Sequence, residues 1–165
     1  MEAISMKQAI AGTIISSLLL LVVSCAGHEA TIHQEGSELE VLLETLDNRI
    51  VQLNTNIERL GKQMIALKQI PETSDPALQE LRQLDLAGWQ LHQKQWMLQR
   101  EHLLFTKAQL HQVLETPEKK PQLLAHWTTQ LQHYQAALAD LRQQRHGLED
   151  KYVQVEAQVI EQYLH

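Results

Sequence analysis

The sequence predicts an all-α fold, specifically an elongated antiparallel three-helix coiled-coil bundle. The composition favours helices, because the 165 residues include only six glycines and 4% aromatic side chains, while leucine and glutamine are abundant. Apolar residues recur at alternating spacings of three and four in three long segments, which is the pattern of coiled-coil helices. Short proline-containing breaks separate these segments, and short connections make consecutive helices antiparallel neighbours.

We expect the first helix over residues 38–69. Ser37 and Glu40 match the capping box S-x-x-E, in which each side chain bonds the other residue's backbone N–H, so the helix should begin there. An uninterrupted apolar seam follows, which predicts one buried face. The seam consists of Leu39, Leu43, Leu46, Ile50, Leu53, Ile57, Leu60, Met64 and Leu67.

We expect the second helix over residues 76–115. Pro71 ends the preceding helix, and Ser74 or Asp75 can cap a new one with Pro76 in its first position. This helix carries two apolar rows on different sides, as a helix between two neighbours requires. The rows are Leu84, Leu91, Leu98 and Phe105, and Trp89, Trp96, Leu103 and Leu110. The tryptophans on these rows, like Trp127, are interpreted as core residues rather than as a ligand-binding patch.

We expect the third helix over residues 122–164, with an apolar seam that only Arg145 interrupts. Because it is the longest helix, its last turn should extend beyond the other two and leave apolar residues without cover. These residues form a candidate partner seam, and a frayed terminus is the alternative interpretation. The candidate partner seam is Tyr152, Val155, Val159 and Tyr163. The competing architecture is an extended hairpin that oligomerises along all its seams.

Residues 6–25 read MKQAIAGTIISSLLLLVVSC and have the layout of a secretory signal peptide. A lysine lies near the start, an apolar stretch of about 14 residues begins at Ile10, and a small residue precedes Cys25. This stretch is shorter than the roughly 20 residues that a membrane-spanning helix needs. An acidic residue precedes Met6, and both Met1 and Met6 are candidate translation starts.

The residues Val22, Val23, Ser24 and Cys25 resemble the lipobox of bacterial lipoproteins. The resemblance implies that the Cys25 thiol receives a diacylglycerol, that signal peptidase II cuts before Cys25, and that the new amino terminus is acylated. In the enterobacterial sorting pattern, Ala26 after the cysteine implies the periplasmic face of the outer membrane, with the inner membrane less favoured. The alternatives are an ordinary cleaved signal peptide or a signal anchor, in which Cys25 is incidental.

Nine histidines raise the question of a metal site, but their spacing disfavours one. His126 and His133 lie seven residues apart, which places them roughly 10 Å apart along a helix. Metal–nitrogen bonds are near 2.0–2.1 Å, so these two histidines would not bind the same ion. No pair of histidines is three or four residues apart. We therefore expect no metal site, and a periplasmic metal or stress sensor remains the alternative function.

The sequence predicts a protein that is not an enzyme, has no cofactor and does not bind nucleic acid. It contains no phosphate-binding glycine loop and no hydrolase or metalloprotease motif, and its formal net charge is −6. We expect a signal peptide over 1–24, a lipidated N-terminus and flexible tether over 25–36, and a three-helix domain over 37–165. The expected function is a membrane-anchored periplasmic spacer, adaptor or assembly factor, resembling pilotins. It would contact the membrane through acyl chains on Cys25, and another envelope protein or a second copy of itself.

Overall fold

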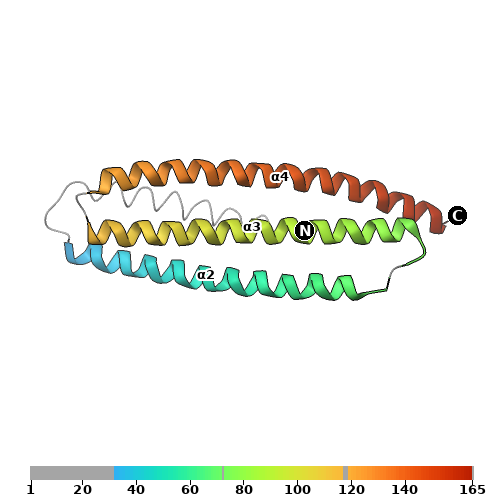
Figure 1. Cartoon of the computed structure of the whole chain (residues 1–165), viewed down its shortest axis with the longest axis horizontal. Coiled ribbons are helices and arrows are strands. Elements are labelled where there is room, and N and C mark those ends of the chain that lie inside the picture. Colours follow the sequence, from blue (N-terminus) through green and yellow to red (C-terminus); the bar gives the residue numbers. More distant parts are fainter. Residues whose placement is uncertain (1–31, 72, 117–118, 165) are drawn as a thin grey trace. The chain divides into compact units, whose positions relative to one another are not determined.

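The computed structural model of the chain describes residues 32–71, 73–116 and 119–164. These residues form α2 (Ile32–Gln69), α3 (Pro76–Glu115) and α4 (Lys120–Leu164), and they include no strand. The chain divides into two compact units, Met1–Leu42 and Leu43–His165, and the packing contacts below lie within the second. Within this unit the three long helices run in alternating directions (Figure 1), so the predicted all-α antiparallel fold is confirmed.

The predicted seam of α2 forms the densest part of the core. Five of its residues are buried, and Leu53 is the most deeply buried, with 1% of its surface exposed. The five are Leu46, Ile50, Leu53, Leu60 and Met64. By contrast, Val51 and Ile65 on the same helix are 63% and 59% exposed. The four- and three-residue spacing in the sequence therefore identified the buried face of this helix.

The predicted start of α2 is wrong, because the helix begins at Ile32 and Ser37 lies inside it. Residues 32–36, which were expected to belong to the flexible tether, are helical. The physical reason is that capping is a weak preference. A good cap contributes only about 1 kcal/mol. Ile, His, Gln and Glu are all tolerated in helices, and Gly36 costs roughly 1 kcal/mol relative to alanine.

α2 and α3 face each other in a register that repeats every seven residues. Three facing pairs step along the two helices in opposite directions. They are the ion pair Asp47–Lys107, the 3.3 Å hydrogen bond from Arg100 Nη1 to Asn54 Oδ1, and Gly61 opposite Gln93, whose Nε2 would lie 3.6 Å from a Cβ atom added at Gly61. Because seven residues complete nearly two turns, the same two helix faces meet at each of these levels.

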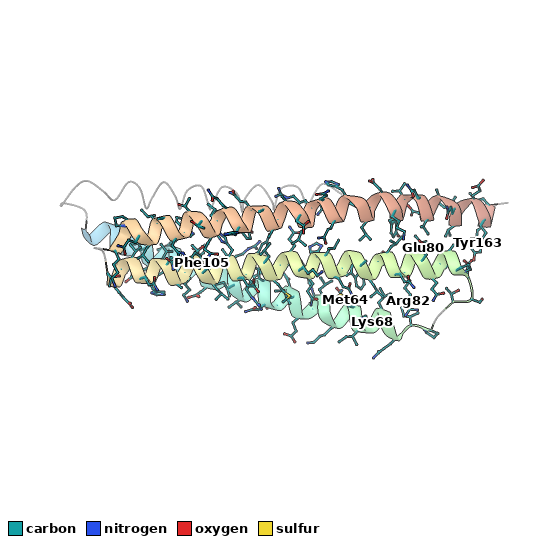
Figure 2. All side chains as sticks on the ribbon, turned by 45° about the horizontal axis from the view of Figure 1, so that its top comes forward. Met64, Lys68, Glu80, Arg82, Phe105 and Tyr163 are labelled. Atoms are coloured by element: carbon teal, nitrogen blue, oxygen red, sulfur yellow. The ribbon has the colours of Figure 1, made fainter. Side chains whose placement is uncertain are left out.

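Arg82 joins the end of α2 to the beginning of α3. Its guanidinium donates hydrogen bonds to the carbonyl oxygens of Leu67 at 2.6 Å, Lys68 at 3.1 Å and Pro71 at 3.2 Å. The last carbonyl groups of a helix have no partner within the helix, so Arg82 satisfies groups that would otherwise need water. Figure 2 labels Arg82 and Lys68 at this end of the two helices.

Asp75 caps α3, and Pro76 follows it at the first helical position, as the sequence predicted. Its Oδ1 atom accepts hydrogen bonds from the backbone N–H groups of Ala77 at 2.9 Å and Leu78 at 3.3 Å. α4 begins at Lys120, two residues earlier than predicted. Pro121 is accommodated there because the N–H groups of the first turn have no helical partner in any case.

α3 and α4 also pack antiparallel with a seven-residue repeat. The ring of His102 stacks on Tyr134, with centroids 4.1 Å apart and planes 9° apart. Fourteen residues away in opposite directions, a Cβ atom added at Gly88 would lie 3.5 Å from Cδ2 of Leu148. The same seven-residue step continues this row on α4 at Trp127 and Val155, which are 6% and 5% exposed. The predicted role of Trp127 as a core residue is thus confirmed.

Candidate partner-binding surface

The candidate partner seam lies on the side of α4 that faces α3. Val155 is 5% exposed, and Tyr152 and Val159 are half-buried. The pKa of Tyr152 is raised, mainly by the nearby carboxylate of Asp85 on α3 and then by burial. The prediction that the seam lacks cover within the chain is therefore wrong for Val155, whereas Tyr163 is 61% exposed, in agreement with that prediction. The role of this seam in binding a partner stays a prediction.

The end of α4 reaches the first residue before α3, which explains why Val155 is covered. The hydroxyl of Tyr163 donates a hydrogen bond to Asp75 Oδ2. Side chains on a helix lean toward its N-terminus, so the Tyr163 side chain points back along α4, to the level of Asp75, rather than beyond the end of the helix. Figure 2 shows Tyr163 at the end of α4 beside the start of α3. The expected overhang of one turn is thereby reduced to the last residues of α4.

A different set of residues on α4 is apolar and exposed. Val153 is 63% exposed, Ile160 50% and Leu164 77%, and Ala157 between them is exposed as well. We call Val153, Ala157, Ile160 and Leu164 the outer stripe. At 100° per residue these four positions fall within roughly 60° of each other around the helix. The outer stripe lies roughly 125° from the seam that faces α3.

Acidic side chains lie along both edges of the outer stripe. Glu149 and Glu156 lie along one edge, and Asp150 and Glu161 along the other. Around the helix axis, each is roughly 50–70° from the centre of the stripe. All four residues are exposed. Glu149 forms ion pairs with Arg145 at 3.2 Å and with His146 at 3.4 Å. This surface is therefore an apolar strip between two acidic borders.

The sequence contained a signal for the outer stripe that the seam analysis missed. Val153, Ala157, Ile160 and Leu164 are spaced by four, three and four residues, and each follows a seam residue by one or two positions. Two overlapping apolar periods at the end of one helix indicate a helix with two apolar faces. The seam that faces α3 runs the length of α4, whereas this second period is confined to the end of the helix.

The interior between α3 and α4 holds polar groups as well as apolar ones. His102 is 7% exposed and Thr106 3%, and burial lowers the pKa of His102. The Oε1 atom of Gln109 and the Nε1 atom of Trp127 are buried, and neither has a hydrogen-bond partner among the described residues. A buried polar atom without a hydrogen-bond partner costs stability, so these two atoms weaken the packing of α3 against α4.

Arg145, the one interruption in the α4 seam, is half-buried, and its Nε atom lies 3.2 Å from Glu149. Its position fits the behaviour of a long basic side chain whose stem packs while its head stays near water. Arg145 also affects α3. The pKa of His92 is lowered mainly by burial of the His92 ring, and the positive charge of Arg145 lowers it further.

Four of the described histidines have contacts of known geometry: His92, His102 and His126 contact aromatic rings, and His146 contacts the carboxylate of Glu149. His92 meets Trp96 edge-on at 4.5 Å, and His126 meets Phe105 edge-on at 5.4 Å. Within residues 32–71, 73–116 and 119–164, no group of three or more histidine, cysteine, aspartate or glutamate side chains is arranged to hold a metal ion. The metal or stress sensor expected as the alternative function stays a prediction.

The lipidation site and signal peptide expected from the sequence, including Cys25, lie outside the described residues. In the part that is described, none of the helices combines the length and apolar character needed to cross a membrane. Comparisons with protein-family models, with curated proteins and with solved structures find no match to the chain. The function is therefore argued below from the chain's own residues.

Proposed function

We propose that the chain is a membrane-anchored periplasmic lipoprotein that works as a helical adaptor or assembly factor through protein–protein contacts. The observation that carries this proposal is the exposed outer stripe of α4. Isolated apolar residues are common on protein surfaces, but an aligned strip of them on a helix is typical of a binding face. The three aligned large residues are 50–77% exposed.

Attachment to the membrane would come from Cys25. Its position after Val22, Val23 and Ser24 resembles a lipobox, and the chain has no other cysteine. Each buried CH₂ group contributes about 0.8 kcal/mol, so one acyl chain binds marginally while two or more anchor a protein stably. Ala26 in the next position favours the outer membrane under the enterobacterial sorting pattern.

The adaptor role fits the separation between the apolar residues that stabilise the fold and the apolar residues that stay exposed. The α2 seam and the α3–α4 row stabilise the three-helix unit, and they use side chains that are nearly all buried or half-buried. The outer stripe contributes no such burial within the unit. A partner helix could therefore cover the stripe without unpacking the core.

Photo-crosslinking in cells tests the proposal. A photoreactive amino acid at Val153 or Ile160 should form covalent adducts with one discrete envelope protein. The same amino acid at Gln158, which is exposed on α4 away from the stripe, is the matched control. Cys25→Ala, which removes the acylated thiol, should abolish palmitate labelling and reduce the adducts. Adducts of equal yield from Gln158, or palmitate labelling that persists in Cys25→Ala, would contradict the proposal.

A further inference from the structure

We propose that the outer stripe binds an amphipathic helix of another protein whose apolar face is bordered by lysine or arginine side chains. This inference rests on the proposed adaptor function and specifies the chemistry of the partner. It follows from the acidic borders of the stripe, from the engagement of the nearby basic residues, and from the charge that other occupants would carry.

The acidic borders have the geometry of the charged positions that flank a coiled-coil seam. In paired helices, the residues beside the apolar seam face charged residues of the partner and determine which partner is accepted. Here both flanking rows are acidic: Glu149 and Glu156 on one side, Asp150 and Glu161 on the other. A complementary helix therefore carries positive charge on both sides of its apolar face.

Of the basic residues near the stripe, Lys151 is directed away from it and Arg145 engages one border residue, Glu149. Lys151 is the only lysine or arginine between residues 147 and 164. Its ammonium group pairs with Glu80 of α3 at 3.2 Å, on the side of α4 away from the stripe. Arg145 pairs with Glu149 and lies beside the seam that faces α3. Glu156 and Glu161 thus define the charge along most of the stripe.

The acidic borders also disfavour two other kinds of binding partner for the outer stripe. A second copy of this helix would place acidic borders against acidic borders, in either orientation, and like charges across an interface weaken it. A membrane surface binds helices whose polar face is rich in lysine and arginine, because cellular membranes carry anionic lipids. The outer stripe has the opposite charge on its borders.

Binding of two designed peptides to the full chain tests the proposal. Both peptides are three-heptad amphipathic helices with leucine in the seam; one carries lysine and the other glutamate at all flanking positions. The full acylated chain is held in nanodiscs of zwitterionic lipid, and empty discs measure binding to lipid alone. We expect fluorescence anisotropy to show saturable binding of the lysine peptide that weakens with added salt, and at least about tenfold weaker binding of the glutamate peptide.

Variants locate the binding on the stripe. Ile160→Gln combined with Leu164→Gln keeps every charge and should weaken the lysine peptide about tenfold or more. Val51→Gln combined with Ile65→Gln changes two similarly exposed residues on α2 and should leave binding unchanged. Glu156→Gln combined with Glu161→Gln should weaken binding roughly threefold and reduce its dependence on salt.

Three results would overturn the inference. The first is equal binding of the lysine and glutamate peptides. The second is unchanged binding by the Ile160→Gln/Leu164→Gln variant, since the lysine peptide would then be attracted by net charge alone. The third is a dimer of the free chain that the same variant dissociates, which would make a second copy the occupant. The peptide assay measures binding to the stripe alone and does not test which partner is present in cells. Peptide binding without adducts in cells would therefore count against the proposed function and leave the surface chemistry intact.

Discussion

The hydroxyl of Tyr163 donates a hydrogen bond to the Oδ2 atom of Asp75, 88 residues earlier in the chain. The other carboxylate oxygen of Asp75 accepts the two backbone N–H groups that open α3. One aspartate therefore caps the middle helix and holds the end of the last one. The bond to Tyr163 is the largest cause of the lowered pKa of Asp75, and the bond to Asp75 is the largest cause of the raised pKa of Tyr163.

Asp75→Ala should lower the melting temperature more than Tyr163→Phe does. The alanine variant removes both the helix cap and the hydrogen bond, whereas the phenylalanine variant removes only the bond to an exposed hydroxyl. Loss of a cap corresponds to a fall of about 2–4 °C in a chain of this size. Circular dichroism at neutral pH measures both changes. Asp75→Asn keeps a capping oxygen and is the control; equal falls for Asp75→Ala and Tyr163→Phe would contradict the dual role of Asp75.

The contribution of the Tyr163–Asp75 bond should depend on pH in a defined window. The folded pKa of Asp75 lies below its ordinary value of 3.8, so this contribution is complete above 3.8 and is lost as pH falls through the folded pKa. The folded pKa of Tyr163 lies above 10.0, so the contribution is complete below 10.0 and is lost as pH rises through the folded pKa. The difference in melting temperature between the wild type and Tyr163→Phe should therefore be constant from about pH 5 to about pH 9. A difference that changes within this range would count against the bond.

Leu53→Ala should be among the most destabilising substitutions in α2, because Leu53 is 1% exposed. Removing a buried leucine side chain costs about 2–5 kcal/mol, depending on how far the cavity collapses. Val51→Ala, two residues away at 63% exposed, should change the free energy of unfolding by less than about 0.5 kcal/mol. Urea denaturation measures both. Similar effects of the two variants would show that the seam is not the buried face.

Periodicity predicted the helices well because burial along α2 and α3 depends on local spacing. The α2 seam, the cap at Asp75 and the proline breaks are all properties of neighbouring residues. The start of α2 was not predictable in this way, since one turn around Gly36 changes the free energy by only about 1 kcal/mol. The level at which α4 ends was also not predictable from helix lengths, because it depends on the register set by contacts such as His102–Tyr134.

Gly147→Ala should stabilise the chain. Gly147 lies within α4, is exposed, and has nothing within 4 Å of an added Cβ atom. Alanine in a helix interior is favoured over glycine by roughly 0.5–1 kcal/mol. Gly88→Leu, in contrast, should destabilise by about 1–3 kcal/mol, because a Cβ atom there already lies 3.5 Å from Leu148 and leaves no room for a larger side chain. Urea denaturation should give changes of opposite sign, and a stabilising Gly88→Leu would show that α3 and α4 are not in this register.

The predicted seam of α4 includes the buried Val155, while an adjacent set of apolar residues on the same helix is exposed. Val155 and Val153 are two residues apart, yet one is 5% exposed and the other 63%. The sequence shows both as apolar residues in overlapping periods, and only the position of α3 decides which period is buried. For the same reason the sequence alone does not show that Glu156 and Glu161 border an exposed apolar strip. That conclusion depends on the exposure of Val153 and Ile160.

His102→Phe should reduce the loss of stability on acidification. His102 is 7% exposed and stacked on Tyr134, and burial lowers its pKa from the ordinary 6.5. Above 6.5 the folded and unfolded chains both hold His102 neutral, so its buried position carries no proton penalty. As pH falls below 6.5 the unfolded chain takes up a proton first, and stability declines until the pH reaches the folded pKa. Phenylalanine keeps a stacked ring and has no proton to bind.

Thermal melts between about pH 7.5 and about pH 5 test this prediction. The melting temperature of His102→Phe should fall less steeply with pH than that of the wild type. His133→Gln, which changes an exposed histidine next to Tyr134 on α4, is the comparison variant. Parallel slopes for the wild type and His102→Phe would mean that another group causes the acid sensitivity. His92 would be examined next, because burial and the charge of Arg145 lower its pKa as well.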